Sequence, residues 1–168
     1  MTKVFIKTYG CSFNQLDSQI IETLLSKNNY EIIRDDENAD LVIINSCSVK
    51  NLSEAKLFND INRYSQENKK IIVCGCVPQA EKSYLKTKLK NVSVIGINDL
   101  DKAVEVADNT IKGKTTHVVN ELEKRSRNEK NRTNKEKLRL LTNENKLNTI
   151  HAIIPINEGC LNKCTFCK

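Results

Sequence analysis

Short apolar runs and amphipathic stretches alternate along the first two-thirds of the chain. Each run is nearly continuous, as in a strand that is buried on both faces. Four such runs predict strands at residues 4–9, 41–45, 71–75 and 92–95. Apolar residues at helical spacing predict helices at residues 14–27, from Ser53 onwards, at 81–89 and at 100–111. This alternation predicts an α/β fold, a doubly wound parallel sheet with helices on both faces.

Polar residues mark where these helices begin. Ser53 is expected to cap the second helix and Asn98 or Asp99 the last, because short polar side chains satisfy the free amide groups of a first turn. Pro78 is expected at the turn into the third helix. The α/β pattern ends near residue 112, so residues 1–112 form the first predicted domain.

Residues 113–148 are dominated by Asn, Lys, Arg, Glu and Thr. We interpret them as a flexible basic linker, with a helical piece around 134–141 as an alternative for part of it. They carry 10 basic and 5 acidic residues, against 15 of each in residues 1–112, so they hold most of the net charge of +6. A solvated charged segment is the simplest interpretation, and contact with RNA phosphates is the functional one. Apolar residues return at 149–155 and predict a strand that opens a second domain at 149–168.

The compartment follows from what the chain lacks. No apolar run approaches the roughly 20 residues that span a bilayer, and the N-terminus has no secretory apolar segment. We therefore expect a cytoplasmic protein with no membrane partner. In a reducing compartment the seven cysteines are metal ligands or reactive thiols rather than a disulfide framework.

Three cysteines close the sequence at C-x3-C-x2-C spacing: Cys160, Cys164 and Cys167. Thiolates are soft ligands that select iron–sulfur clusters, zinc or Cu(I). Electron-transfer clusters normally take four cysteines, so a set of three leaves one position open, as in catalytic metal sites. The sequence ends one residue later, at Lys168, so we interpret this segment as the start of a truncated domain.

Cys11, Cys47 and Cys76 each fall just after a predicted strand. The carboxyl ends of parallel strands share one edge of the sheet, where open α/β folds build their sites. The three thiols are therefore expected to converge on one cluster, the alternative being buried or incidental cysteines.

Other polar and sulfur-containing residues near the predicted strands are given lesser roles. Cys74 lies within a strand and is expected in the core, the alternative being that it replaces one of the three ligands. His117 and His151 have no partners at metal-ligand spacing, so surface or packing roles are expected for both. Asn45 and Ser46 are placed to donate hydrogen bonds to cluster sulfurs.

At these residues the chain resembles a known family. Segments 9–14, 45–49 and 75–79 look like the three cysteine motifs of the methylthiotransferase N-terminal domain, and 159–167 looks like that family's radical-SAM motif. Segments 77–80 and 154–168 are similar to the archaeal and eukaryotic branch, which modifies threonylcarbamoyladenosine at tRNA position 37. The branches acting on isopentenyladenosine tRNA or a ribosomal protein usually have Asn in place of Leu161 and an aliphatic residue in place of Lys168.

The resemblance implies two [4Fe–4S] clusters and no catalytic residues beyond their ligands. Cys160, Cys164 and Cys167 would hold the cluster that binds S-adenosylmethionine and yields a radical. The other set, Cys11, Cys47 and Cys76, would hold an auxiliary cluster that presents sulfur, and a second S-adenosylmethionine would supply the methyl group. The implied activity is methylthiolation of C2 of N6-threonylcarbamoyladenosine in tRNA, with an electron donor such as ferredoxin or flavodoxin.

The sequence departs from the family pattern in its length. Family members continue into a full radical-SAM barrel and an RNA-binding domain, so we expect this chain alone to be inactive. A fragment, a split protein with a separate chain carrying the barrel, and an incomplete sequence all stay open. Rival functions are an iron–sulfur electron-transfer module that works with a separate barrel protein, a zinc-stabilised RNA-binding module, and a methylthiotransferase of another substrate branch.

Overall fold

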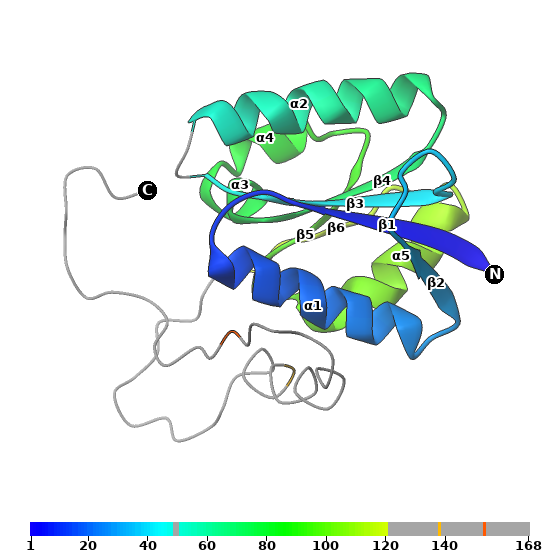
Figure 1. The fold of residues 1–168 in the computed structure, drawn as a ribbon. Coiled ribbons are helices and arrows are strands. Elements are labelled where there is room, and N and C mark those ends of the chain that lie inside the picture. The colour runs from blue at the N-terminus through cyan, green and yellow to red at the C-terminus, as the bar shows by residue number, and fades with distance from the viewer. Residues whose placement is uncertain (49–50, 121–137, 139–152, 154–168) are drawn as a thin grey trace.

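Six parallel strands form the centre of the computed structural model, which describes residues 1–48, 51–120, 138 and 153 (Figure 1). Their order across the sheet is β2-β1-β3-β4-β5-β6. The strands are β1 (Thr2–Thr8), β2 (Tyr30–Ile33), β3 (Leu41–Ser46), β4 (Lys70–Gly75), β5 (Ser93–Ile95) and β6 (His117–Val118). The helices are α1 (Ser12–Ser26), α2 (Asn51–Gln66), α3 (Cys76–Ala80), α4 (Ser83–Lys86) and α5 (Ala103–Ile111), the last preceded by the 3-10 turn η1 (Leu100–Lys102). The predicted doubly wound α/β fold is confirmed.

Two apolar layers cover the sheet, with α1 and α5 on one face and α2 and α4 on the other (Figure 1). Side chains of β3 alternate between these layers, because successive residues of a strand point to opposite faces. Leu41 and Ile43 join the layer under α1 and α5, whereas Val42 and Ile44 join the layer under α2. Burial on both faces is why the strand sequences are continuously apolar.

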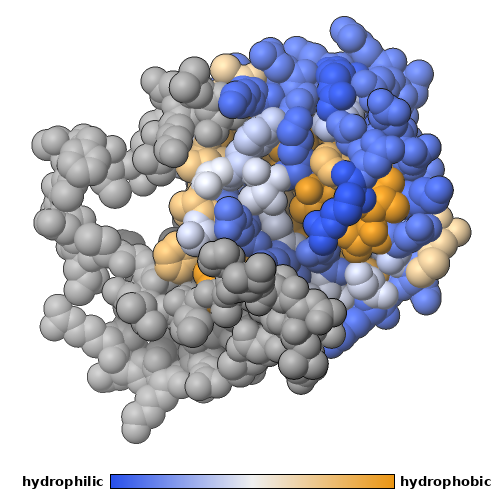
Figure 2. Space-filling model, in the orientation of Figure 1, coloured by the Kyte–Doolittle hydropathy of each residue, from blue (hydrophilic) through white to orange (hydrophobic). Residues whose placement is uncertain are grey.

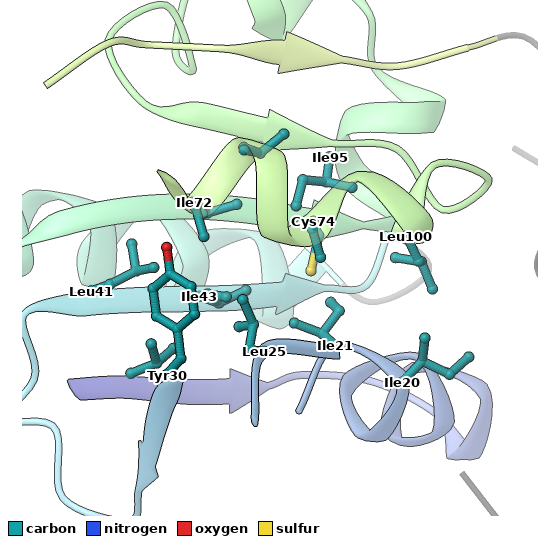
Figure 3. Packing of buried hydrophobic residues seen from close by; sticks show 14 residues of the cluster. Ile20, Ile21, Leu25, Tyr30, Leu41, Ile43, Ile72, Cys74, Ile95 and Leu100 are labelled. Carbon is teal, nitrogen blue, oxygen red and sulfur yellow. The ribbon is translucent and has the colours of Figure 1, made fainter. Parts of the chain in front are cut away.

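The layer under α1 and α5 also contains Cys74 (Figure 3). Its side chain is fully buried among Ile21, Ile43 and Ile95 in this layer, so the predicted core role is confirmed. Burial raises the pKa of the Cys74 thiol, since a thiolate is poorly solvated there. This cysteine therefore behaves as a small apolar residue.

The loop between β2 and β3 is held on α2 by one carboxylate. Asp36 accepts hydrogen bonds from the Tyr64 hydroxyl at 2.6 Å and from the Arg63 guanidinium at 2.5 Å. These two bonds, the tyrosine's foremost, lower the pKa of the Asp36 carboxyl. Hydrogen bonds therefore join this loop to α2 in addition to its apolar contacts.

Several elements differ from the sequence prediction. The short edge strands β2 and β6 were not expected, and β6 lies beyond residue 112, so the sheet uses part of the expected linker. The helix expected at 81–89 is only the four-residue α4, because Glu81 and Thr87 have non-helical backbone angles. The second helix begins at Asn51, ahead of the expected cap Ser53.

The visible surface is largely hydrophilic, with a hydrophobic area over part of the sheet (Figure 2). Among the described residues, the exposed large hydrophobic side chains are Met1 and Phe13. No helix in the described part of the chain is long and apolar enough to cross a membrane.

Candidate metal centre

Three of the cysteines lie at the carboxyl ends of three neighbouring strands. Cys11 follows β1 and is the residue that precedes α1, Cys47 directly follows β3, and Cys76 directly follows β4 as the first residue of α3. In the sheet β3 lies between β1 and β4. The predicted placement of the three cysteines at one edge of the sheet is confirmed.

Two glycines let the three loops approach one another. Gly10 has a φ of 120°, and a Cβ there would lie 2.8 Å from the Cβ of Cys47. Gly75 has a φ of 95°, and a Cβ there would lie 2.3 Å from the carbonyl oxygen of Ser46. The positive φ favours glycine at both positions, and at Gly75 the close backbone contact leaves no room for a side chain. The loops of Cys11 and Cys76 therefore both pack against the end of β3.

A buried polar network lies beneath the cysteines. The Asn14 amide donates to Asn45 Oδ1 at 2.9 Å and to the Ser46 carbonyl at 3.0 Å. The Asn45 amide donates in return to the Asn14 carbonyl at 2.8 Å and to Ser18 Oγ at 3.0 Å. Thr8 joins this network through a 2.7 Å hydrogen bond with Ser18. These bonds fasten the start of α1 to the ends of β1 and β3.

This network overturns one expectation. Asn45 and Ser46 were expected to donate hydrogen bonds to cluster sulfurs, but the Asn45 amide donates within the network and Ser46 Oγ donates to the Cys74 carbonyl at 2.6 Å. Both side chains are fully buried. Their role here is to fix the ends of β3 and β4, not to face the sulfurs.

The three thiols differ in exposure and lie close enough to influence one another. Cys11 is exposed, Cys76 is half-buried and Cys47 is buried. Burial is the main cause that raises the pKa of the Cys76 thiol, the neighbouring Cys47 and Cys11 raise it further, and interactions with Asn14 and the Ser48 backbone partly offset the rise. Charging several thiols together is therefore unfavourable unless a cation neutralises them. A bound metal would supply that charge.

The helix dipole adds a favourable contribution at Cys11. This residue precedes the 15-residue helix α1 and has an extended backbone. The amino end of a helix carries partial positive charge, which favours a negative group beside it. A negatively charged group bound beside Cys11 would therefore lie in a favourable field at the exposed side of the site.

As the side chains stand, no group of three or more His, Cys, Asp or Glu in the described residues is arranged to hold a metal ion. The Cys11 thiol instead donates to Asn14 Oδ1 at 3.3 Å. Two observations nevertheless fit a cluster: the donors are soft thiols, and glycine occupies the positions where a Cβ would close the space between the loops. The residues present therefore fit an iron–sulfur group held by three cysteines.

The remaining candidates are resolved differently. His117 is exposed and one of its ring nitrogens pairs with the Val92 carbonyl at 2.9 Å, so it has a surface role, one of the two expected of it. His151, Cys160, Cys164 and Cys167 lie outside the described residues.

After β6 the chain returns to the edge of the sheet where the three cysteines lie, beside α3, the helix that begins with Cys76. The Asp99 carboxylate, expected as a helix cap, makes no capping bond and accepts from the Asn120 backbone amide at 2.9 Å and from the Asn120 side chain. Gln79 donates to the Asn120 carbonyl at 3.1 Å. Sequence reasoning missed this contact, because residue 120 fell in the expected linker.

Residues 3–96 match the family described as "Uncharacterized protein family UPF0004". This span is more than half of the chain and contains Cys11, Cys47 and Cys76. The chain belongs to this family.

Curated relatives of this UPF0004 chain share one name across eukaryotes and archaea. It is 38% identical over 169 residues to the threonylcarbamoyladenosine tRNA methylthiotransferase of Danio rerio, covering 100% of this chain and 29% of that protein. The human protein of the same name is 38% identical over 99% of the chain and 27% of its own length. A probable member from Pyrococcus horikoshii is 32% identical over 99% of the chain and 36% of its own length. The resemblance to the archaeal and eukaryotic branch is confirmed.

The UPF0004 chain therefore spans about a third of the length of these relatives, or less. Among solved structures, a short-chain flavodoxin associated with a bacterial microcompartment matches at 15% identity and a TM-score of 0.36, over 85% of this chain and 95% of its own. That similarity is too low to inform fold or function.

Proposed function

We propose that this chain is the N-terminal part of a tRNA methylthiotransferase that modifies C2 of N6-threonylcarbamoyladenosine at position 37. The observation that carries the proposal is the meeting of Cys11, Cys47 and Cys76 at the carboxyl ends of β1, β3 and β4, with Gly10 and Gly75 at the points of closest approach. Relatives that carry this activity in their names match the chain along nearly its whole length.

In this proposal the chain supplies two sets of ligands. Cys11, Cys47 and Cys76 would hold an auxiliary [4Fe–4S] cluster, and Cys160, Cys164 and Cys167 would hold the cluster that binds S-adenosylmethionine. When bound, the clusters and S-adenosylmethionine would supply the radical needed for an unactivated adenine C–H bond, the sulfur, and the methyl group.

The described residues contribute position and access. Buried Cys47 and half-buried Cys76 form the inner side of the site, and exposed Cys11 forms its outer side. Three thiols leave one position of a cluster without a protein ligand, and a substrate could contact the cluster at that position. Substrate would therefore approach from the side of Cys11.

The partners belong to the same proposal. They are tRNA, an electron donor such as ferredoxin or flavodoxin, and a barrel domain in the same protein or in a separate chain. A cytoplasmic location suits seven thiols kept reduced.

Anaerobic reconstitution of the 168-residue chain with iron and sulfide tests the ligand sets. The wild-type chain should take up two [4Fe–4S] clusters, and Cys76→Ala should take up one. Cys74→Ala is the matched control, because Cys74 lies two residues away in the core and should not affect loading. Uptake of zinc alone, or equal loading of the Cys76 variant and wild type, would overturn the cluster assignment.

Mass spectrometry of tRNA tests the substrate. A strain that lacks the gene should lose the methylthio group from threonylcarbamoyladenosine and keep the unmodified nucleoside. Persistence of the methylthiolated nucleoside would defeat the assignment to this branch.

A further inference from the structure

Asn14 is a buried amide at the centre of the three cysteine loops. It lies in the first turn of α1, three residues after Cys11, and only 2% of its surface is exposed. A buried amide is costly unless its donors and acceptor are paired. The side-chain partners of Asn14 are Cys11, just before α1, and Asn45 and Ser46, at the end of β3.

Each loop is contacted by this one residue or by its direct partner. In the β1 loop, Asn14 Oδ1 accepts from the Cys11 thiol at 3.3 Å. In the β3 loop, Asn14 Nδ2 donates at 3.0 Å to the carbonyl of Ser46, the residue before Cys47. At the end of β4 the contact is made by its partner: Asn45 Oδ1, which accepts from Asn14, would lie 2.4 Å from a Cβ on Gly75, the residue before Cys76.

The amide orientation is fixed by these partners. Nδ2 faces two acceptors, the Ser46 carbonyl and Asn45 Oδ1, so both of its hydrogens are used. Oδ1 is consequently the atom that faces Cys11. An aspartate could not donate these two bonds, and it would add a buried charge beside the thiols.

The space around Asn14 also fits this residue closely. The Cβ of an alanine at position 10 would lie 2.8 Å from Asn14 Oδ1 and 3.0 Å from its Cγ. Asn14 therefore fills the space that glycine leaves open. A smaller side chain would leave the Ser46 carbonyl and Asn45 Oδ1 without a donor.

We propose that Asn14 is a positioning residue that holds the loops of Cys11, Cys47 and Cys76 at the spacing of the auxiliary cluster without being a ligand. The proposal rests on the cluster assignment made above. Partners around the ligands of a metal site typically change metal affinity by about 10- to 100-fold when removed. A loss of that size is expected when Asn14 is truncated.

The test uses the full chain with Cys160→Ala, Cys164→Ala and Cys167→Ala, so that only one cysteine set remains. This parent, Asn14→Ala and the control Asn28→Ala are reconstituted anaerobically, and cluster release to a chelator is followed by absorbance and by electron paramagnetic resonance. Asn28 is a matched control because its amide donates at 2.8 Å to the Leu24 carbonyl at the far end of α1. Circular dichroism of each metal-free variant verifies folding at the assay temperature.

Asn14→Ala should release its cluster about 10- to 100-fold faster than the parent, with an altered resonance signal. Asn28→Ala should match the parent. If Asn14→Ala does not fold, Asn14→Ser keeps one donor and should release the cluster at an intermediate rate. Parent-like release from the folded Asn14 variant overturns the positioning role alone, whereas a parent that takes up no cluster overturns the proposed function and this role with it.

Discussion

Replacing Gly75 by alanine tests how tightly the end of β4 packs against the end of β3. Gly75 has a φ of 95° and a ψ of −154°, a region that is essentially restricted to glycine and costs other residues about 1–3 kcal/mol. The new Cβ would also lie 2.3 Å from the Ser46 carbonyl oxygen and 2.4 Å from Asn45 Oδ1. Neither contact is relieved by moving a flexible side chain end, because one atom is backbone and the other belongs to a buried, hydrogen-bonded amide.

The expected cost combines strain and overpacking. Forcing extra atoms into a packed site typically costs roughly 1–3 kcal/mol, so the two effects together should lower the free energy of unfolding by about 4 kcal/mol. Gly113→Ala separates them, since Gly113 also has a positive φ, 81°, but a Cβ there would meet nothing within 4 Å. That control should lose only about 1–2 kcal/mol.

Urea unfolding of the metal-free chain, followed by far-ultraviolet circular dichroism, measures both variants. The free energy of unfolding should fall clearly more in Gly75→Ala than in Gly113→Ala. Equal losses would mean that the end of β4 does not pack against the end of β3 as described.

Three further predictions concern the network, the thiols and the acid response. Asn14→Ala and Asn45→Ala should be non-additive in urea unfolding, with a coupling of about 0.5–3 kcal/mol, and additive losses would contradict a shared network. Among the four cysteines that the structure describes, iodoacetamide should alkylate Cys11 of the metal-free chain first and Cys74 last, as read by mass spectrometry, because Cys11 is exposed and Cys74 is buried with a raised pKa. The folded-state pKa of Asp36 is lowered, so its stabilising effect is present above the ordinary carboxyl pKa and is lost as the pH falls through the folded value. Asp36→Asn should therefore be less stable than wild type at pH 7 and lose less stability on acidification below about pH 4, and an unchanged acid titration would refute this.

The sequence predicted the central strands because each is buried on both faces and so reads as a continuous apolar run. Leu41–Ser46 is an example, with every residue buried. The edge strands lack this signal: Tyr30–Ile33 has one buried residue in four, and His117–Val118 has only two residues. A pattern of hydrophobicity cannot distinguish such short edge strands from loops.

The sequence predicted where the three cysteines lie, but not the hydrogen bonds that hold their loops in place. Cysteines that follow strands could be assigned to one edge by topology alone. The roles of Asn14 and Asn45 could not, because their partners lie 31 and 32 residues away and only the folded chain brings them together. A usable signal was the glycine that precedes Cys11 and the one that precedes Cys76, because Gly10 and Gly75 mark a close approach to a neighbouring part of the chain.

The direction of β6 decides where the rest of the polypeptide starts. Because β6 is parallel to β5, Asn120 emerges at the cysteine edge of the sheet. There it is held by Asp99 and by Gln79, which lies in α3, the helix that begins with Cys76. An antiparallel strand would have released the chain at the opposite edge, where the amino ends of the other strands lie. A tether that begins beside a binding site raises the effective concentration of whatever it carries there. The fold thus favours encounters between the cysteine edge and the segment that follows.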